Sequence, residues 1–346
     1  MPFRDLAGHR RTFLLLSRSI ALGSLPPSLV FTGPEGVGKR RAALALAQTL
    51  NCPAPKRDVA IDPGVVLPID ACGACPSCRR LARLVHPDLL VVEPDEETGN
   101  TRIEEVRPLL ERIAYRPFEA HWRVVVIDRA EALVSAAQNA LLKTLEEPPS
   151  STVFVLVASR PDALLPTVRS RCPPIRFGPL AIADVARVLE RDHNIPAREA
   201  QGLAAVSGGS VGAALQTGAA SLANARAAAS RLLAELARPR DVHARLAAAG
   251  AIVGKTSKGY GAGEREALTI HLRAVHALLR DLGVMSARGS APEVANVDLE
   301  PALAKLASAF DGPRLVAAFA AVDQALAALQ GNASPKIVAD WVVMHI

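Results

Sequence analysis

The stretch GPEGVGKR, residues 33–40, decides the fold of the first half of this chain. It follows the apolar run Ser28–Thr32, which predicts a buried strand, and it opens Arg40–Leu50, which is rich in strong helix formers. A glycine-rich turn between a strand and a helix allows backbone N–H groups to wrap phosphate oxygens. The alternative is a turn of this kind that holds no ligand. The predicted phosphate cradle consists of Gly33, Gly36, Gly38 and Lys39, with the lysine reaching the β- and γ-phosphates.

The last residue of this loop departs from the phosphate-binding pattern. The pattern requires Ser or Thr there, because the hydroxyl ligates Mg²⁺, and this chain has Arg40. A guanidinium has no acceptor atom and cannot ligate a cation. ATP binding is therefore compatible with the loop, whereas Mg²⁺-dependent hydrolysis is not expected.

A second motif of nucleotide-binding sites, the strand followed by acidic residues, also departs from its usual pattern. The β-branched run Arg123–Ile127 predicts another buried strand, and Asp128 follows it, where a carboxylate helps to hold the metal ion. The next position usually carries the carboxylate that activates water, and here it is Arg129. We expect Glu131 to be a surface residue at the start of the following helix.

Apolar runs with little polar alternation recur between helical patterns, which predicts an α/β domain whose parallel sheet is covered on both faces. From Leu180 onward the strand signals stop, and the pattern is helical. With 346 residues the chain is too long for one core, so more than one domain is expected. The further expected strands are Leu89–Val92 and Thr152–Ala158; the expected helices are Ile103–Ala114, Ala130–Leu145, Leu180–Leu189, Ala197–Val206, Leu222–Ala237, Ala244–Val253, Glu264–Leu282, Pro301–Phe310 and Pro313–Leu329; residues 254–263 and Met285–Val297 are expected loops.

The composition indicates a globular, cytoplasmic protein. Half of the residues are hydrophobic and 21% are charged, which excludes a disordered chain. A net charge of +6 permits contact with nucleic acid but is explained equally well by a solvated basic surface, and the basic stretch Lys255–Gly259 is expected to be a solvated loop. The first residues lack the apolar core of a signal peptide, and no stretch has the about 18–20 uninterrupted apolar residues of a membrane span.

Four of the five cysteines are clustered in the pattern C-x19-C-x2-C-x2-C. Four thiolates around one tetrahedral Zn²⁺ make a closed, structural site, whereas a redox motif does not need four thiols and chance clustering is a poor alternative. The surrounding prolines and glycines interrupt the α/β pattern, so the sequence predicts an inserted zinc module. We expect His86 to be a loop residue and not a fifth ligand. The predicted zinc ligands are Cys52, Cys72, Cys75 and Cys78.

Five stretches, taken in order, resemble the bacterial clamp-loader subunits of DNA polymerase III, which are AAA+ proteins. The resemblance covers about residues 5–215 through these motifs, and the remainder only through its helical architecture. The stretches are GPEGVGKR (33–40), NC…CGACPSC (51–78), VVVIDRAEAL (124–133), QNALLKTLEEPP (138–149) and VRSRC (168–172).

Three departures decide which kind of clamp-loader subunit the chain resembles. The γ/τ motor subunits carry Thr at the position of Arg40, Glu at that of Arg129 and a sensor arginine at that of Gly212. A chain that lacks all three of these residues resembles the δ′ subunit. The resemblance implies that the chain has no ATPase activity of its own and is a component of the DNA polymerase III holoenzyme, a DNA-directed DNA polymerase and hence a nucleotidyltransferase complex.

The motif Ser170-Arg171-Cys172 is retained. In the family this motif ends the AAA+ core, and its arginine reaches across a subunit interface. The resemblance therefore implies that Arg171 acts in trans on ATP held by a neighbouring motor subunit, where a guanidinium stabilises charge on the transferring phosphoryl group. The alternative is a local ion pair. Arg169 and Arg176 are expected to be surface charges, and Cys172 a small packing residue.

The resemblance implies three domains. A RecA-like AAA+ domain with an α/β fold would span residues 1–178 and contain the zinc module at about 52–80. A helical lid would span 179–221, and an all-helical collar 222–346. The collar would join γ/τ and δ subunits in a hetero-pentameric ring, which loads the sliding clamp onto primed DNA.

Three other functions remain open on the sequence alone. The first is an active γ/τ-like ATPase motor, against which Arg40, Arg129 and Gly212 argue. The second is a nucleotide sensor that binds ATP without hydrolysing it. The third is a zinc-dependent DNA-binding module, which predicts steeply salt-sensitive binding to DNA; the modest net charge argues against it.

Overall fold

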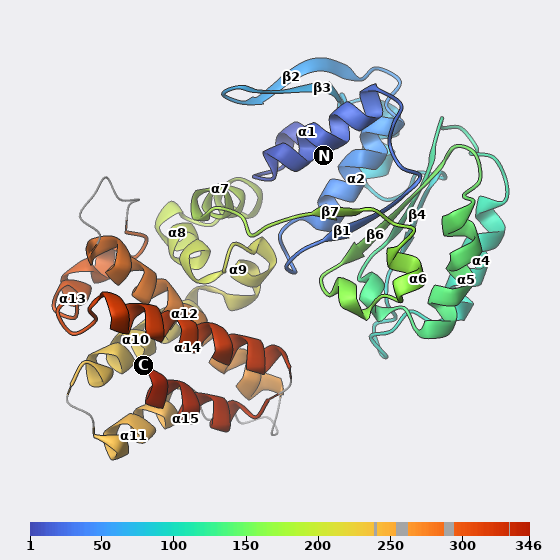
Figure 1. The fold of residues 1–346 in the computed structure, drawn as a ribbon. Helices are drawn as coiled ribbons and strands as arrows, with labels where there is room; N and C mark the ends of the chain where they lie inside the picture. Colours follow the sequence, from blue (N-terminus) through green and yellow to red (C-terminus); the bar gives the residue numbers. More distant parts are fainter. Residues whose placement is uncertain (239–240, 254–261, 287–293, 332) are drawn as a thin grey trace. The chain divides into compact units, whose positions relative to one another are not determined.

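A parallel sheet of five strands in the order β4-β5-β6-β1-β7 forms the centre of the first half of the chain (Figure 1). Every pairing within it is parallel, and the register places Val124 of β5 beside Val153 of β6. Four of the strands, β1, β4, β5 and β6, are the short apolar runs that the sequence predicts, whereas the short strand β7 is not predicted. Their bounds are Ser28–Thr32 (β1), Leu89–Val92 (β4), Arg123–Ile127 (β5), Thr152–Ala158 (β6) and Pro174–Arg176 (β7).

Alternate strand residues enter two separate hydrophobic cores. Phe31, Val124 and Val155 pack into one core with α1 and α2, whereas Val125 and Phe154 pack into the other with α4 and α5. The sheet is therefore covered on both faces, and the α/β prediction is confirmed. The elements on the two faces and in the connecting segments are η1 (Phe3–Asp5), α1 (Arg10–Ala21), α2 (Lys39–Leu50), α3 (Pro76–Ala82), α4 (Ile103–Ile113), η2 (Ala130–Ala132), α5 (Ser135–Glu146), η3 (Pro161–Ala163) and α6 (Pro166–Arg169).

This computed structural model describes residues 1–238, 241–253, 262–286, 294–331 and 333–346. The described residues divide into two compact units, Met1–Ala181 and Ile182–Ile346. The predicted finer division of the second unit into a lid and a collar at 221/222 stays a prediction.

The region between the first and second cysteines contains an antiparallel hairpin that the sequence does not predict. Its strands are β2 (Lys56–Asp62) and β3 (Val65–Asp70). The Ser17 hydroxyl on α1 donates to the carbonyl oxygen of Ile69 and accepts from its N–H group, so the hairpin is fixed against α1. The hairpin escapes a reading of hydrophobic pattern because β2 is mostly exposed and charged.

The single helix predicted for Ala130–Leu145 is wrong in its first turns. A 3₁₀ turn, η2, comes first, and the α-helix α5 begins only at Ser135. The interruption has a clear cause, because the backbone of Thr101 pairs with this segment: its N–H donates to the Ala132 carbonyl, and its own carbonyl accepts from the Val134 N–H.

The second unit is helical throughout its described residues, as the sequence predicts. The long helix α12 packs against α10, α11 and α14, and α15 packs against α11 and α14. The expected loop 254–263 falls mostly, and the expected loop Met285–Val297 partly, outside the described residues. The helices are α7 (Ile182–His193), α8 (Ala197–Val206), α9 (Val211–Thr217), α10 (Ala219–Leu236), α11 (Val242–Val253), α12 (Ala262–Ser286), η4 (Val297–Leu299), α13 (Glu300–Ala304), α14 (Gly312–Gln330) and α15 (Pro335–His345).

Helix α14 is long and apolar enough to pass a composition test for a membrane span over Gly312–Leu329. The helix carries Arg314 and Asp323, and buries Ala318 and Val322 against its neighbours in the helical unit. Core helices of soluble proteins pass the same test, so this feature assigns no membrane contact.

Candidate functional site: a phosphate loop closed by its own side chains

The phosphate loop has the backbone that the glycine pattern predicts. Gly33, Gly36 and Gly38 all have positive φ, at 140°, 73° and 103°. Gly38 is the residue before α2, so the loop joins the carboxyl end of β1 to a helix N-terminus. Gly33 has a second constraint, because a Cβ there would lie 1.9 Å from the carbonyl oxygen of Phe177. The glycines therefore meet both the demands of an anion cradle and the demands of packing against the end of β7.

The lysine of the loop is buried and bound to its own chain. Its Nζ atom lies 2.7 Å from the carbonyl oxygen of Gly33, 2.6 Å from that of Pro34 and 3.0 Å from the hydroxyl of Ser159. An ammonium has three N–H donors, so these three acceptors engage all of them. Burial lowers the pKa of Lys39, and the nearby carboxylates of Glu131, Glu35 and Asp128 oppose this. A phosphate could reach this ammonium only by displacing the loop carbonyls.

Arg40 lies where the pattern would place a metal-binding hydroxyl, and it forms ion pairs with two carboxylates. Its Nε atom is 3.3 Å from Asp128, and its Nη2 atom contacts Glu93. Asp128 follows β5, Glu93 follows β4, and Ser159 follows β6, so these groups meet at the carboxyl ends of parallel strands. Ligands of open α/β sheets bind at this edge. Here a guanidinium supplies the positive charge that a divalent ion would supply in a metal-binding pocket.

Burial raises the pKa of Asp128, and the Arg129 N–H and the charge of Arg40 act against that rise. Glu93 and Ser159 were not predicted as part of the site. The signal was available for Glu93, since a charged residue directly after a buried parallel strand reaches the same edge as Asp128. Ser159 follows its strand in the same manner.

The prediction that Glu131 is a surface residue is wrong. Its carboxylate accepts a hydrogen bond of 3.0 Å from the Ser159 N–H, and its other oxygen is buried. Glu131 lies in the 3₁₀ turn η2, which precedes α5, and not in the α-helix that the sequence predicts here. Arg129, by contrast, is exposed and has φ 46°. Because this residue is an arginine, no carboxylate occupies the usual water-activating position.

The Ser170-Arg171-Cys172 motif follows the short helix α6 at the edge of the same unit. Cys172 is fully buried in the core shared with α4 and α5, which confirms its packing role. The Arg171 side chain is 31% exposed, and its Nη2 atom lies 2.9 Å from a carboxylate oxygen of Glu146, whose side chain is 58% exposed. Its Nη1 atom donates to the Thr167 carbonyl at 3.0 Å. The local ion pair that the sequence left open is therefore present.

The neighbouring arginine, Arg169, pairs with exposed Asp162 at 2.8 Å. Arg169 and Arg176 are both exposed, as predicted.

The four clustered cysteines converge although Cys52 precedes Cys72 by 20 positions in the sequence. Their Sγ atoms all lie within 4.8 Å of one another, and those of Cys72 and Cys78 are 3.9 Å apart. A tetrahedral zinc ion with Zn–S bonds of about 2.3 Å would place its sulfurs about 3.8 Å apart. The donor set and its spacing therefore fit Zn²⁺. His86 does not join the cluster: it is buried, and its Nδ1 accepts from the Asp88 N–H.

Backbone N–H groups point at three of the four sulfurs. The N–H groups of Cys72, Cys75 and Cys78 donate to the sulfurs of Cys52, Cys72 and Cys75 at 3.2–3.3 Å. Burial acts to raise the pKa of Cys72, but hydrogen bonds, led by those from the Ala74 and Cys75 N–H groups, outweigh it and lower this pKa to about 6. Such donors stabilise thiolates and orient them toward a metal ion.

Comparisons with known proteins place these features in one family. The family model described as DNA polymerase III, delta subunit, matches residues 8–181. The chain is 37% identical over 182 residues to the DNA polymerase III subunit delta′ of Pseudomonas aeruginosa, covering 51% of each chain. It is 34% identical over 185 residues to the subunit delta′ of Bacillus subtilis, covering 53% of this chain and 51% of that one.

A second kind of DNA polymerase III subunit is also similar. Identity to the DNA polymerase III subunit tau of Salmonella typhimurium is 31% over 188 residues, which covers 54% of this chain and 27% of that subunit. The chain thus spans about half, or less, of the length of these curated relatives.

Proposed function

Because the chain belongs to the family described as DNA polymerase III, delta subunit, we propose that it is a non-motor, delta′-like subunit of a clamp loader. In this role it joins γ/τ and δ subunits in a cytoplasmic hetero-pentameric ring that places a sliding clamp on primed DNA. It contributes structure and one catalytic group, and it does not hydrolyse ATP.

The observation that carries this proposal is the internal neutralisation of the phosphate loop. The ammonium of Lys39 donates to three groups of its own chain, and the guanidinium of Arg40 pairs with Asp128 and Glu93. Both cationic side chains that would face Mg²⁺–ATP are therefore already bound to groups of this chain. No hydroxyl stands at position 40, so the residues do not fit a magnesium ion.

The proposed catalytic contribution is made by Arg171 to a neighbouring motor subunit. A guanidinium near the γ-phosphate stabilises the charge that develops during phosphoryl transfer. The pair with Glu146 does not oppose this role, because both side chains are partly exposed and exposed ion pairs contribute only about 0–1 kcal/mol. A phosphate group, which carries more charge than Glu146, would displace the glutamate without large cost.

The proposed role of the cysteine cluster is to hold one structural Zn²⁺. The cluster offers four protein donors, which would close the coordination sphere and leave no site for a substrate. Metal binding then stabilises the inserted segment by coupling its folding to coordination.

A nucleotide sensor without hydrolysis is the second candidate. The positive-φ glycines and the helix N-terminus favour it, since this backbone is suited to bind phosphate oxygens. A sensor subunit differs from a subunit with an empty nucleotide site in one measurable property, which is the binding of ATP by the isolated chain.

The test mixes the full chain with the γ/τ and δ chains of the same organism. We expect the three to elute together in size-exclusion chromatography and the mixture to hydrolyse ATP, while the isolated chain does not. Turnover by the isolated chain at the rate of a motor subunit would contradict the proposal, as would failure to elute with either partner.

A further inference from the structure

The residues that precede α1 lie against the part of the chain that carries three of the four clustered cysteines. This part, residues 70–78, is named here the cysteine segment. Gly73 lies within it and has φ 80°, and a Cβ added there would lie 2.9 Å from the Cγ atom of the buried Pro2. The residues before α1 therefore pack so closely on the cysteine segment that no side chain fits between them.

A buried aspartate fastens the two segments together. Asp70 is fully buried, and its Oδ1 atom accepts hydrogen bonds from the N–H groups of Phe3 and Ala71, at 3.0 and 2.9 Å. Its Oδ2 atom accepts from the N–H group of Arg4 at 3.3 Å and from the Nη1 atom of the same residue at 2.9 Å. Hydrogen bonds to a charged acceptor are strong, so residues 3 and 4 are held in one position.

The guanidinium of Arg4 in turn binds the backbone of the cysteine segment. Its Nη1 atom donates to the carbonyl oxygen of Ala71 at 2.6 Å, and its Nη2 atom donates to that of Cys72 at 2.8 Å. The side chain is only 21% exposed. A guanidinium is planar and presents its donors in a fixed fork, so bonds to two successive carbonyl groups define the orientation of both peptide planes.

The opposite edges of these two peptide planes face sulfur atoms. In a trans peptide the C=O and N–H groups point in opposite directions. The N–H group of Cys72, which shares a peptide plane with the Ala71 carbonyl, donates to the Sγ atom of Cys52 at 3.2 Å. The next plane ends in the N–H group of Gly73. Burial raises the pKa of the Cys78 thiol, and the hydrogen bond from the Gly73 N–H group acts against that rise. The guanidinium thus orients two N–H donors toward the cluster.

Two further side chains hold the other end of the cysteine segment. Gln48 on α2 is 1% exposed, and its Nε2 atom donates to the carbonyl oxygen of Cys78 at 2.7 Å. The hydroxyl of Ser77 donates to the carbonyl oxygen of Asn51, the residue before Cys52, at 3.0 Å. The backbone around the thiols is therefore held from outside at several points, and Arg4 acts on the end that contains Cys72.

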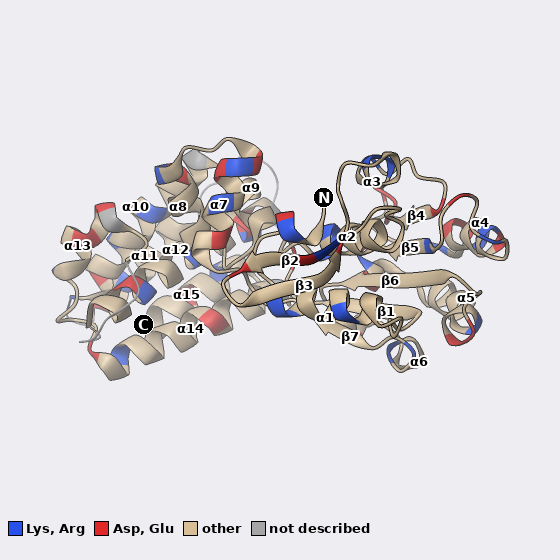
Figure 2. Ribbon diagram, turned by 90° about the horizontal axis from the view of Figure 1, so that it is seen from above, with Lys and Arg blue, Asp and Glu red and all other residues tan. Residues whose placement is uncertain are grey.

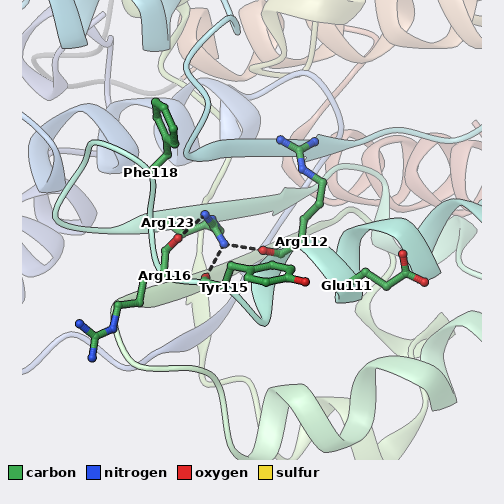
Figure 3. Close-up of a pocket in the computed structure, with 6 residues that line it drawn as sticks. All are labelled: Glu111, Arg112, Tyr115, Arg116, Phe118 and Arg123. Atoms are coloured by element: carbon green, nitrogen blue, oxygen red, sulfur yellow. Dashed lines mark hydrogen bonds between the residues drawn. The ribbon is translucent and has the colours of Figure 1, made fainter.

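The same construction fixes another irregular part of this unit. Figure 3 shows Arg123, which pairs with the fully buried Asp88 at 3.2 Å. Its Nη atoms donate at 2.5–2.9 Å to the carbonyl oxygens of Arg112, Tyr115 and Arg116. That pair holds the backbone that leads into β5. The Arg4–Asp70 pair is built alike, but the peptide planes that it orients carry N–H donors to sulfur.

These contacts distinguish the Arg4–Asp70 pair from a general stabiliser of the fold. A buried ion pair gives little net stability, because both charges are desolvated. Here the guanidinium bonds to the backbone of a cysteine and of the residue before it. Groups that hold metal ligands in place from outside typically contribute about 10–100-fold to metal affinity.

We propose that Arg4 and Asp70 are positioning residues that pre-orient the cysteine segment for one tetrahedral divalent metal ion, so that the residues before α1 belong to the metal site. This proposal rests on the proposed zinc site and extends it to a part of the chain without thiols. Because coupling between two events is reciprocal, bound metal also orders residues 3–6.

Metal binding by the full chain tests the proposal. Zn²⁺ affinity is measured by competition with a chromogenic chelator. Co²⁺ then replaces Zn²⁺, because its absorption spectrum reports the number and geometry of its thiolate ligands. Arg4→Ala should weaken Zn²⁺ affinity by about 10–100-fold and should alter the Co²⁺ spectrum.

Arg4→Lys separates orientation from charge, and it serves as the deciding variant if Arg4→Ala does not fold. The ammonium keeps a positive charge facing Asp70 but lacks the planar fork that spans two carbonyl groups. The free energy of unfolding should stay near that of the wild type, whereas Zn²⁺ affinity should still fall by about tenfold. Wild-type affinity in Arg4→Lys would overturn the proposal, because charge alone would then suffice.

Two other arginines supply the controls. Arg10 pairs at 2.6 Å with Asp62 at the tip of the β2–β3 hairpin, so Arg10→Ala removes an arginine–aspartate pair between the same parts of the chain. Arg83→Ala removes an exposed charge directly after α3, whose basic residues are blue in Figure 2. Both should bind Zn²⁺ as the wild type does. A loss in either control as large as that in Arg4→Ala would contradict a specific role for Arg4.

Amide hydrogen exchange gives a second readout. Removal of Zn²⁺ from the wild-type chain should lower protection at residues 3–6 and 70–78, whereas β5 should stay protected. Residues 3–6 that remain equally protected without metal would show that the coupling is absent. Wild-type chain that binds neither Zn²⁺ nor Co²⁺ would refute the zinc site and this proposal together, whereas unchanged metal affinity in both Arg4 variants would refute this proposal alone.

Discussion

The Nε atom of Arg40 lies 3.3 Å from the carboxylate of Asp128, so the residue that replaces the metal-binding hydroxyl supplies the missing positive charge itself. Glu93 pairs with the same guanidinium. The edge of the sheet is thereby neutralised without an ion. The guanidinium has a clear electrostatic role. A residue at position 40 with neither a hydroxyl nor a positive charge would leave the carboxylates of Asp128 and Glu93 without a counter-charge.

Arg40→Thr should restore magnesium dependence to ATP binding. The threonine offers a ligand to Mg²⁺ and leaves Asp128 and Glu93 without their guanidinium. Equilibrium dialysis with labelled ATP, with and without Mg²⁺, measures this. Wild-type binding should not respond to Mg²⁺, and Arg41→Thr, at the exposed neighbouring position, should behave as wild type. Wild-type chain that binds ATP more tightly with Mg²⁺ would show that Arg40 leaves the metal position open.

Arg171→Ala should lower the ATPase rate of the reconstituted assembly while assembly itself is unchanged. The expected loss at the adjacent motor site is about a thousandfold, because an arginine finger contributes at least that much to phosphoryl transfer. Arg169→Ala is the control, since the side chain of Arg169 pairs with the exposed Asp162, which lies seven residues earlier in the sequence. A steady-state ATPase assay of the mixture gives the comparison.

Glu146→Gln separates the two roles of Arg171. It removes the partner charge 2.9 Å from the guanidinium but leaves the arginine in place. The ATPase rate should be preserved or raised. If Arg171→Ala has no effect and Glu146→Gln destabilises the chain, the arginine serves only its local ion pair.

Cys75→Ser should abolish zinc binding and loosen residues 52–80. Removing one of four thiolates opens the coordination sphere, and metal binding and local folding are coupled. Metal analysis of purified protein measures the first effect, and amide hydrogen exchange the second. Cys172→Ala removes the only cysteine outside the cluster and should retain the full metal content. Wild-type protein without zinc would refute the site.

Gly33→Ala should destabilise the first unit by about 2–4 kcal/mol, because it combines a positive φ with overpacking. The added Cβ would lie 1.9 Å from the Phe177 carbonyl oxygen, which is backbone and cannot move aside. Gly178→Ala, where nothing lies within 4 Å, should change stability by less than about 0.5 kcal/mol. Denaturant unfolding measures both. Equal effects of the two substitutions on the free energy of unfolding would contradict this prediction.

The sequence predicts those features whose signals are local. The strands β1, β5 and β6 are continuous apolar runs, and glycine spacing alone specifies the loop that ends at Gly38. The cysteine spacing predicts a convergence that the Sγ positions confirm.

What the sequence does not predict depends on contacts between distant residues. The hairpin β2–β3 is stabilised by Ser17, which is 52 residues away from its partner Ile69. The segment that leads into β5 is held by Asp88, which is 30 residues from Phe118 and has no recognisable motif. The sequence predicts Glu131 on the surface because it gives no sign that the backbone of Thr101 interrupts the helix. A single sequence carries no signal for such pairings, because hydrophobic period and turn chemistry report only neighbours along the chain.

The position of Asn51, between the last turn of α2 and the first thiol, has a practical consequence for anyone who purifies this protein. Its amide group fixes Trp122, and its neighbour Cys52 belongs to the thiol cluster. Buffers that contain strong chelators would strip the proposed ion and release this support. The sheet, with its own two cores, would persist. Such a preparation would look intact by circular dichroism although the contacts around Asn51 had loosened, so activity should be compared only between batches of equal metal content.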